Sequence, residues 1–86
     1  MAQTMTNVAV SAASWVEVGD GFPDVAVSTN LAGDFRVYLG PSDPGAESVP
    51  YARGDRFNPV VLEGLGADTG VWVKSQGNES VVVVTK

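Results

Sequence analysis

The chain has 86 residues, enough for one domain, and its ten acidic and five basic residues give a formal net charge of −5. It has no cysteine and no histidine, which excludes disulfides, thiolate zinc sites and the Ser-His and Cys-His arrangements of nucleophilic catalysis. Because those catalytic arrangements are excluded, we expect a non-enzymatic protein. An acidic surface repels phosphate groups, so we also expect that it binds neither nucleic acid nor an anionic membrane.

The first half of the chain is rich in valine and alternates apolar with polar residues, at the period of two that is typical of half-buried strands. Strands are predicted over Asn7–Ser11, Trp15–Val18, Asp24–Ser28 and Asp34–Leu39. Glycine with aspartate or asparagine marks the turns between them. Residues 1–6 include the polar Gln3, Thr4 and Thr6, and we expect the segment to form a flexible arm.

The alternation stops at residues 40–55, which hold three prolines and several glycines and are predicted to form a long loop. Strands are expected again over Phe57–Glu63, Val71–Ser75 and Glu79–Thr85. About seven short antiparallel strands indicate a single all-β domain over residues 7–86, either a small β-sandwich or a small β-barrel. Neither the loop nor the arm suits the core, so both are expected to contact a partner.

Acidic residues in the turns and loops raise two further possibilities. Asp20 with Asp24, or Asp43 with Glu47, could form a catalytic carboxylate pair, and the four together are hard oxygen ligands of the kind that calcium prefers. Aspartate in a turn usually bonds its own backbone, however, and no Asp-x-Asp-x-Asp-Gly spacing occurs. We therefore expect no catalytic residue, no metal and no cofactor.

The two tryptophans occupy the same phase of their strands. Trp15 precedes Val16, and Trp72 lies between Val71 and Val73. If the valines line the core, both indole rings lie on an outer face, where large aromatic side chains often mark contact sites. If the phase is inverted, the tryptophans are core residues.

The run Val81–Val84 is apolar on both faces of its strand. A two-layer domain buries one of these faces, which leaves either Val81 and Val83 or Val82 and Val84 in need of cover. An additional layer or a partner could supply that cover, and we favour a partner. The residues predicted to contact partners are Trp15, Tyr38, Tyr51, Arg53, Trp72, Val82 and Val84.

Three segments carry a resemblance to a known family: Ala-Ser-Trp-Val-Glu-Val-Gly at residues 13–19, Arg-Val-Tyr-Leu-Gly-Pro at 36–41 and Val-Trp-Val-Lys-Ser at 71–75. Over residues 7–85 the chain resembles the small all-β virion proteins of tailed bacteriophages. The resemblance implies a capsid decoration, or cement, protein that is assembled in the host bacterial cytoplasm and stabilises the shell of major capsid protein in the virion. It also implies a homo-oligomer, with a trimer favoured, and no catalytic residues.

Two other roles remain open at this stage. The same three segments also resemble a neck, tail or fibre component of the virion. A free-standing carbohydrate-binding module shares most of the features read from the residues, since aromatic faces flanked by carboxylates suit sugars.

Overall fold

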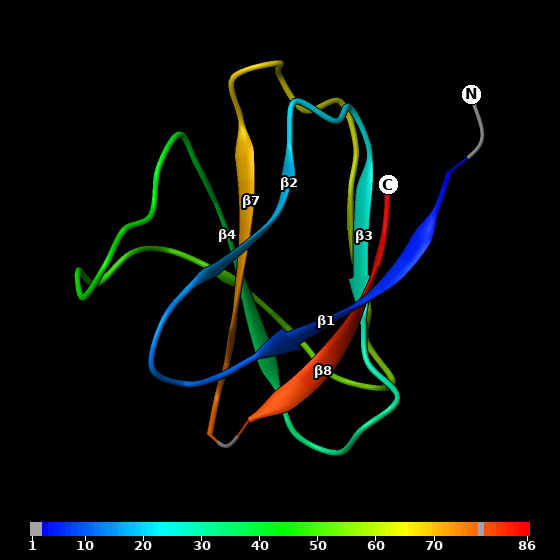
Figure 1. The fold of residues 1–86 in the computed structure, drawn as a ribbon, viewed down its shortest axis with the longest axis vertical. Helices are drawn as coiled ribbons and strands as arrows, with labels where there is room; N and C mark the ends of the chain where they lie inside the picture. The colour runs from blue at the N-terminus through cyan, green and yellow to red at the C-terminus, as the bar shows by residue number, and fades with distance from the viewer. Residues whose placement is uncertain (1–2, 78) are drawn as a thin grey trace.

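The computed structural model describes residues 3–77 and 79–86, and the regular structure in them consists of eight strands in two four-stranded antiparallel sheets (Figure 1). The first sheet has the order β1-β8-β3-β6, with β1 at Met5–Val10, β8 at Ser80–Thr85, β3 at Val25–Ser28 and β6 at Val60–Leu62. The second sheet has the order β2-β7-β4-β5, with β2 at Val16–Asp20, β7 at Gly70–Ser75, β4 at Phe35–Gly40 and β5 at Ala52–Gly54. The predicted all-β fold is confirmed, and because both sheets are open it is the sandwich of the two alternatives. The described residues contain no helix that could cross a membrane.

The structure differs from the sequence-based expectation most at the N-terminal arm and at the long loop. Strand β1 already begins at Met5, and Thr4 exchanges two backbone hydrogen bonds with Lys86, at 2.9 and 3.1 Å. Residues 4–6 therefore extend the first sheet and are not an arm, because β8 offers a full-length partner for them. Residues 1 and 2 of the expected arm lie outside the described residues.

The expected loop is shorter at both ends than predicted. Gly40 ends β4, and residues 52–54 pair with β4 as strand β5, so the connection runs over residues 41–51. In Figure 1 this loop, drawn in green, projects away from the two sheets. The eighth strand was missed because its residues, Ala-Arg-Gly, include no β-branched or large apolar residue and follow directly on the proline-rich loop.

The core lies between the sheets and consists almost entirely of valine. Phe35 is its one aromatic member among the described residues, and Val8, Val16, Leu62 and Leu65 pack at its margin. Its buried residues are Val10, Val18, Val25, Val27, Phe35, Val37, Val60, Val71, Val73, Val82 and Val84. Burying one such valine side chain contributes about 1.5–3 kcal/mol, so these short strands are held together chiefly through their inward faces.

The run Val81–Val84 shows which face of β8 is covered. Val82 and Val84 are 0% and 1% exposed and lie in the core. The prediction that these two valines contact a partner is therefore wrong, because the domain itself buries them. Val81 is exposed and Val83 half-buried, and both belong to the outer face of the first sheet.

Candidate functional site

Aromatic and cationic side chains gather on the outer face of the second sheet. In β4 and β7 the valines and Phe35 point into the core, so the residues between them point outward. This sorting brings together the side chains that we call the aromatic–cationic face: Trp15, Arg36, Tyr38, Tyr51, Arg53, Trp72 and Lys74. Five of the seven residues predicted to contact partners belong to it.

Strand pairing arranges much of this face in two rows that cross the sheet. In the first row, Trp72 lies opposite Glu17 on one side and opposite Tyr38 on the other. In the second row, Arg36 lies opposite Lys74 on one side and opposite Arg53 on the other. Directly opposite residues of antiparallel strands project from the same side of the sheet, so each row is a set of neighbours. We call Lys74, Arg36 and Arg53 the cationic row.

Trp15 precedes β2 and lies outside the valine core, although only 7% of it is exposed. Its ring is 5.8 Å from that of Tyr38, at an interplanar angle of 53°, and the Lys74 ammonium lies 5.6 Å from its centroid. The sequence left open whether the tryptophans lie on an outer face or in the core, and the structure places both on the outer side of the second sheet, opposite to the inward Val16 and Val73. Trp15 is nevertheless covered, because its neighbours on that face pack against it.

Two paired glycines make room for the other two rings. Gly40 and Gly70 lie opposite each other in β4 and β7. A Cβ atom at Gly40 would lie 2.5 Å from the Tyr38 hydroxyl, and one at Gly70 would lie 2.9 Å from Nε1 of Trp72. Nε1 of Trp72 also donates a hydrogen bond of 3.2 Å to the carbonyl of Gly40. The two rings therefore lie along their own strands, in positions that side chains at the glycines would obstruct.

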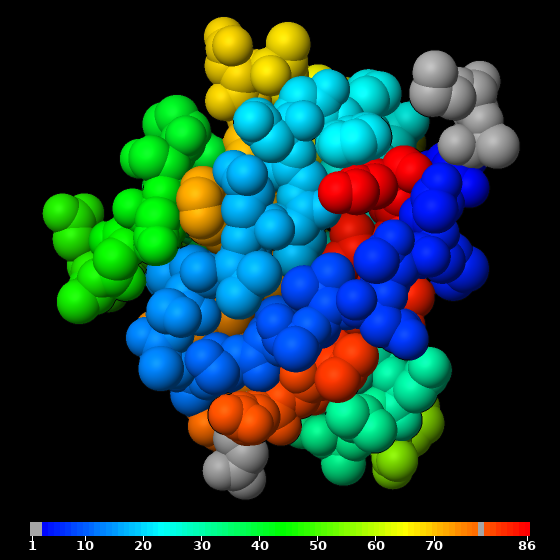
Figure 2. Space-filling view, viewed as in Figure 1, coloured from blue at the N-terminus to red at the C-terminus, as the bar shows by residue number. Residues whose placement is uncertain are grey.

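The loop of residues 41–51 borders the face and forms a half-open cavity with it. The Arg36 guanidinium lies 4.8 Å from the centre of the Tyr51 ring, and its Nε donates to Oε1 of Gln76 at 3.0 Å. The cavity has a volume of about 250 Å³. It is lined from the sheet side by Trp15, Arg36 and Lys74 and from the loop side by Ala46, Glu47, Ser48, Val49 and Tyr51. In Figure 2 the loop, in green, stands out beside the body of the molecule.

Few carboxylates of the chain lie close enough to neutralise the cationic row. Within residues 3–77 and 79–86 a single ion pair occurs, between Arg53 and Asp34, at 3.9 Å and between largely exposed side chains. An exposed pair at that distance contributes at most about 1 kcal/mol. The charges of Arg36 and Lys74 lie instead over aromatic rings, where a cation–π contact stabilises them by about 0.5–1 kcal/mol each at an exposed site.

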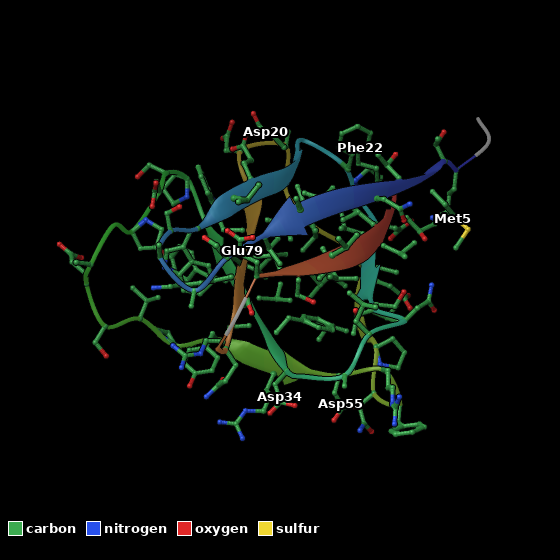
Figure 3. All side chains as sticks on the ribbon, turned by 60° about the horizontal axis from the view of Figure 1, so that its bottom comes forward. Met5, Asp20, Phe22, Asp34, Asp55 and Glu79 are labelled. Carbon is green, nitrogen blue, oxygen red and sulfur yellow. The ribbon has the colours of Figure 1, made fainter. Side chains whose placement is uncertain are left out.

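The acidic residues weighed as calcium ligands are not brought together. Among the described residues no group of three or more carboxylates could hold a metal ion. Oδ1 of Asp43 accepts a hydrogen bond of 2.8 Å from the amide of Gly45, the local turn bond usual for aspartate. Figure 3 shows Asp20 at one end of the molecule and Asp34 and Asp55 at the other. The calcium alternative therefore has no cluster of ligands to support it.

Sequence reasoning missed Arg36 and Lys74 as members of the site. Alternation along a strand places Arg36 on the same side as Tyr38, and Lys74 on the same side as Trp72. The missing information was the pairing of residues 36, 53 and 74, which are far apart in the chain. That pairing turns three separate charges into one row.

Comparisons with protein-family models, with curated protein sequences and with solved structures give no significant match to this chain.

Proposed function

We propose that the chain is a non-enzymatic capsid decoration protein of a tailed bacteriophage, which binds the shell of major capsid protein through the aromatic–cationic face. The observation that carries the proposal is the convergence of two tryptophans, two tyrosines and two arginines on one side of one sheet. These three residue types dominate the energetics of protein–protein interfaces. The role in the virion is inferred from the resemblance of the sequence motifs to those of small all-β virion proteins. A protein at the neck, tail or fibre of the virion would use the same face.

The loop of residues 41–51 provides a second argument that the aromatic–cationic face is the contact region. It projects from the sandwich (Figure 1), and most of its residues are exposed. Its end places the Tyr51 ring beside Arg36 and extends the face beyond the edge of the sheet. Such a loop can reach into a depression of a shell that the flat sheet cannot enter.

The outer face of the first sheet is where we propose that copies of the chain meet, with a trimer favoured. Its strands present no charged side chain: the outward residues are Met5, Asn7, Ala9, Ala26, Ser28, Val61, Val81, Val83 and Thr85. Copies that each carry a net charge of −5 repel one another, so contact through an uncharged face is the least unfavourable. The exposed Val81 and Val61 supply apolar area for that contact.

The experiment that tests the decoration role is a pelleting assay with particles assembled without this chain. The purified protein is expected to pellet with them, and Tyr51→Ala is expected to weaken the binding about 30-fold or more, as truncation of an aromatic hot spot does. Phe57→Ala is the matched control, because Phe57 is 77% exposed and does not belong to the aromatic–cationic face. Equal loss in the two variants, or no pelleting of the wild type, would contradict the proposal.

A carbohydrate-binding module is the second candidate, favoured by one observation. The Tyr38 and Trp72 rings lie along the sheet over glycines and form an aromatic surface with Glu17 beside it. Retention on a polysaccharide column that is lost in Trp72→Ala, together with no pelleting with particles, would establish this candidate over the decoration protein.

A further inference from the structure

We propose that the cationic row binds a carboxylate-bearing, extended segment of the partner protein; this inference rests on the proposed function, because it names the chemistry of the partner at the same face. The row contains three of the five basic residues of the chain. It therefore concentrates positive charge in a molecule whose net charge is −5.

The placement of these charges is unfavourable for the isolated domain. Like charges directly opposite each other on neighbouring strands destabilise a sheet. The chain has ten acidic residues, but in the part that the structure describes only Arg53 has a carboxylate within 4.0 Å. An anionic ligand would relieve the repulsion between Lys74, Arg36 and Arg53 and would gain charge-assisted hydrogen bonds.

The dimensions of the row favour an extended ligand over a single small anion. Neighbouring strands lie about 4.8 Å apart, so the row spans about 10 Å across three strands. Two or three carboxylates on one extended chain can therefore engage it at once. The cavity of about 250 Å³, which is lined by Trp15, Arg36 and Lys74, has room for one of those side chains.

The surroundings favour an acidic protein segment over a nucleic acid. A phosphodiester chain carries charge along its whole length and would continue from the row onto an acidic surface. Glu17 lies in the neighbouring row, and Glu47 lines the cavity itself. A short acidic segment can end at the edges of the row, so that it meets Glu47 in the cavity but does not continue over the rest of the acidic surface.

The probe for this inference is an octaglutamate peptide, with octaglutamine as the neutral comparison. Binding is followed by tryptophan fluorescence, because Lys74 lies directly over the Trp15 ring. We expect octaglutamate to bind and to weaken steeply with added salt, and octaglutamine not to bind. Arg36→Gln and Lys74→Gln are each expected to lower the affinity about tenfold.

Two further variants make the test specific to the row. Arg56→Gln removes the same charge outside the row, where Arg56 contacts the Phe57 ring, and is expected to change the affinity less than about twofold. Glu47→Gln removes a competing carboxylate from the cavity and is expected to raise the affinity several-fold. Equal loss in Arg56→Gln and Arg36→Gln would overturn the inference, and so would tighter binding of oligodeoxythymidylate than of octaglutamate.

The inference and the proposed function fail in different ways. If octaglutamate binds as expected but the chain does not pellet with particles, the decoration role is wrong and the acidic ligand stands. If Arg36→Gln pellets with particles as the wild type does while Tyr51→Ala does not, the face is the contact surface and the acidic ligand is wrong.

Discussion

The outer faces of the two sheets differ in almost every chemical respect, although both sheets contribute valines to the same core. The first sheet presents small, uncharged residues such as Ala9, Ala26 and Val81. The second presents aromatic rings and the cationic row. Because alternate residues of a strand point to opposite sides, each face can carry its own chemistry without disturbing the core. The fold therefore constrains function little, and the outward residues decide it.

The two outer faces also differ in the size of their side chains and therefore in their relief. On the first sheet most outward side chains are short and project little from the plane of the sheet. On the second sheet the large rings of Tyr38 and Trp72 need space, and the paired Gly40 and Gly70 provide it. The first arrangement suits contact with a second flat surface, and the second suits a partner with projecting side chains.

The largest effect is expected from charging the two sides of β8. Val82→Lys places an ammonium in the core, where an unpaired charge costs several kcal/mol beyond the loss of about 1.5–3 kcal/mol of valine burial. A domain of this size has a total stability of about 4–13 kcal/mol, so this variant is expected not to fold. Val81→Lys changes an exposed residue and is expected to keep the fold with a loss below about 1 kcal/mol. Circular dichroism during thermal unfolding checks both.

The same strand tests whether the first sheet is a self-association face. Val81→Lys combined with Val83→Lys is expected to remain folded and to shift the protein to monomers in analytical ultracentrifugation. A wild type that is already monomeric at micromolar concentration would contradict the role of this face in oligomers. Two folded variants, at Val81 and at Val82, would contradict the assignment of inner and outer sides.

A smaller effect is expected from filling the space beneath the rings of the second sheet. A Cβ atom at Gly70 would lie 2.9 Å from both the Gly40 carbonyl oxygen and Nε1 of Trp72. Gly70→Ala is therefore expected to displace the Trp72 ring, to break its hydrogen bond and to cost about 1–3 kcal/mol. Urea unfolding measures the loss, and a shift in tryptophan fluorescence reports the ring.

Gly77→Ala is the control for this variant, since a Cβ atom there has no neighbour within 4 Å. It is expected to leave both the stability and the fluorescence close to those of the wild type. An unchanged fluorescence spectrum in Gly70→Ala would show that the ring does not depend on the glycine.

Much of the contrast between the two faces could be predicted from the sequence. Alternation separated Trp72 from its flanking valines, and the abundance of valine favoured strands with a buried face. This was sufficient for the all-β class, whereas the sequence left open whether the two tryptophans face outward or into the core. It worked because each of these strands has one polar or aromatic side and one uniformly apolar side.

The remainder required contacts between distant parts of the chain. Val81–Val84 has no polar residue to distinguish its sides, so alternation could not say that Val82 faces the core. The outward side is recognisable only from the pairing of Val83 with Asn7 and Ser28. The cationic row depends in the same way on pairing across three strands, which is set by the packing of the whole sandwich.

The smallest effect is expected at the connection between the two sheets, where Asp55 follows β5 and pairs with Asn58 in an isolated bridge. Oδ1 of Asp55 accepts hydrogen bonds from the amide of Phe57 at 2.8 Å and from the amide and side chain of Asn58, both at 3.0 Å. The bond from Phe57, followed by that from the Asn58 side chain, lowers the pKa of this carboxyl below its usual value of 3.8.

Because the pKa of Asp55 is lower in the folded than in the unfolded chain, its charge stabilises the fold above the unfolded pKa, and this contribution disappears as the pH falls through the folded pKa. Asp55→Asn keeps an oxygen acceptor but removes the charge. Its deficit in unfolding free energy relative to the wild type is therefore expected to be constant from about pH 5 to neutrality and to shrink below about pH 4. Urea unfolding at a series of pH values measures the deficit, and the same size at pH 6 and at pH 2.5 would contradict the assignment. The effect is expected to be small and to weaken with salt, because the group lies at the surface. A small effect here would support the view that the sandwich is joined by its valine core and that polar contacts at the crossover only fix the path of the chain between the sheets.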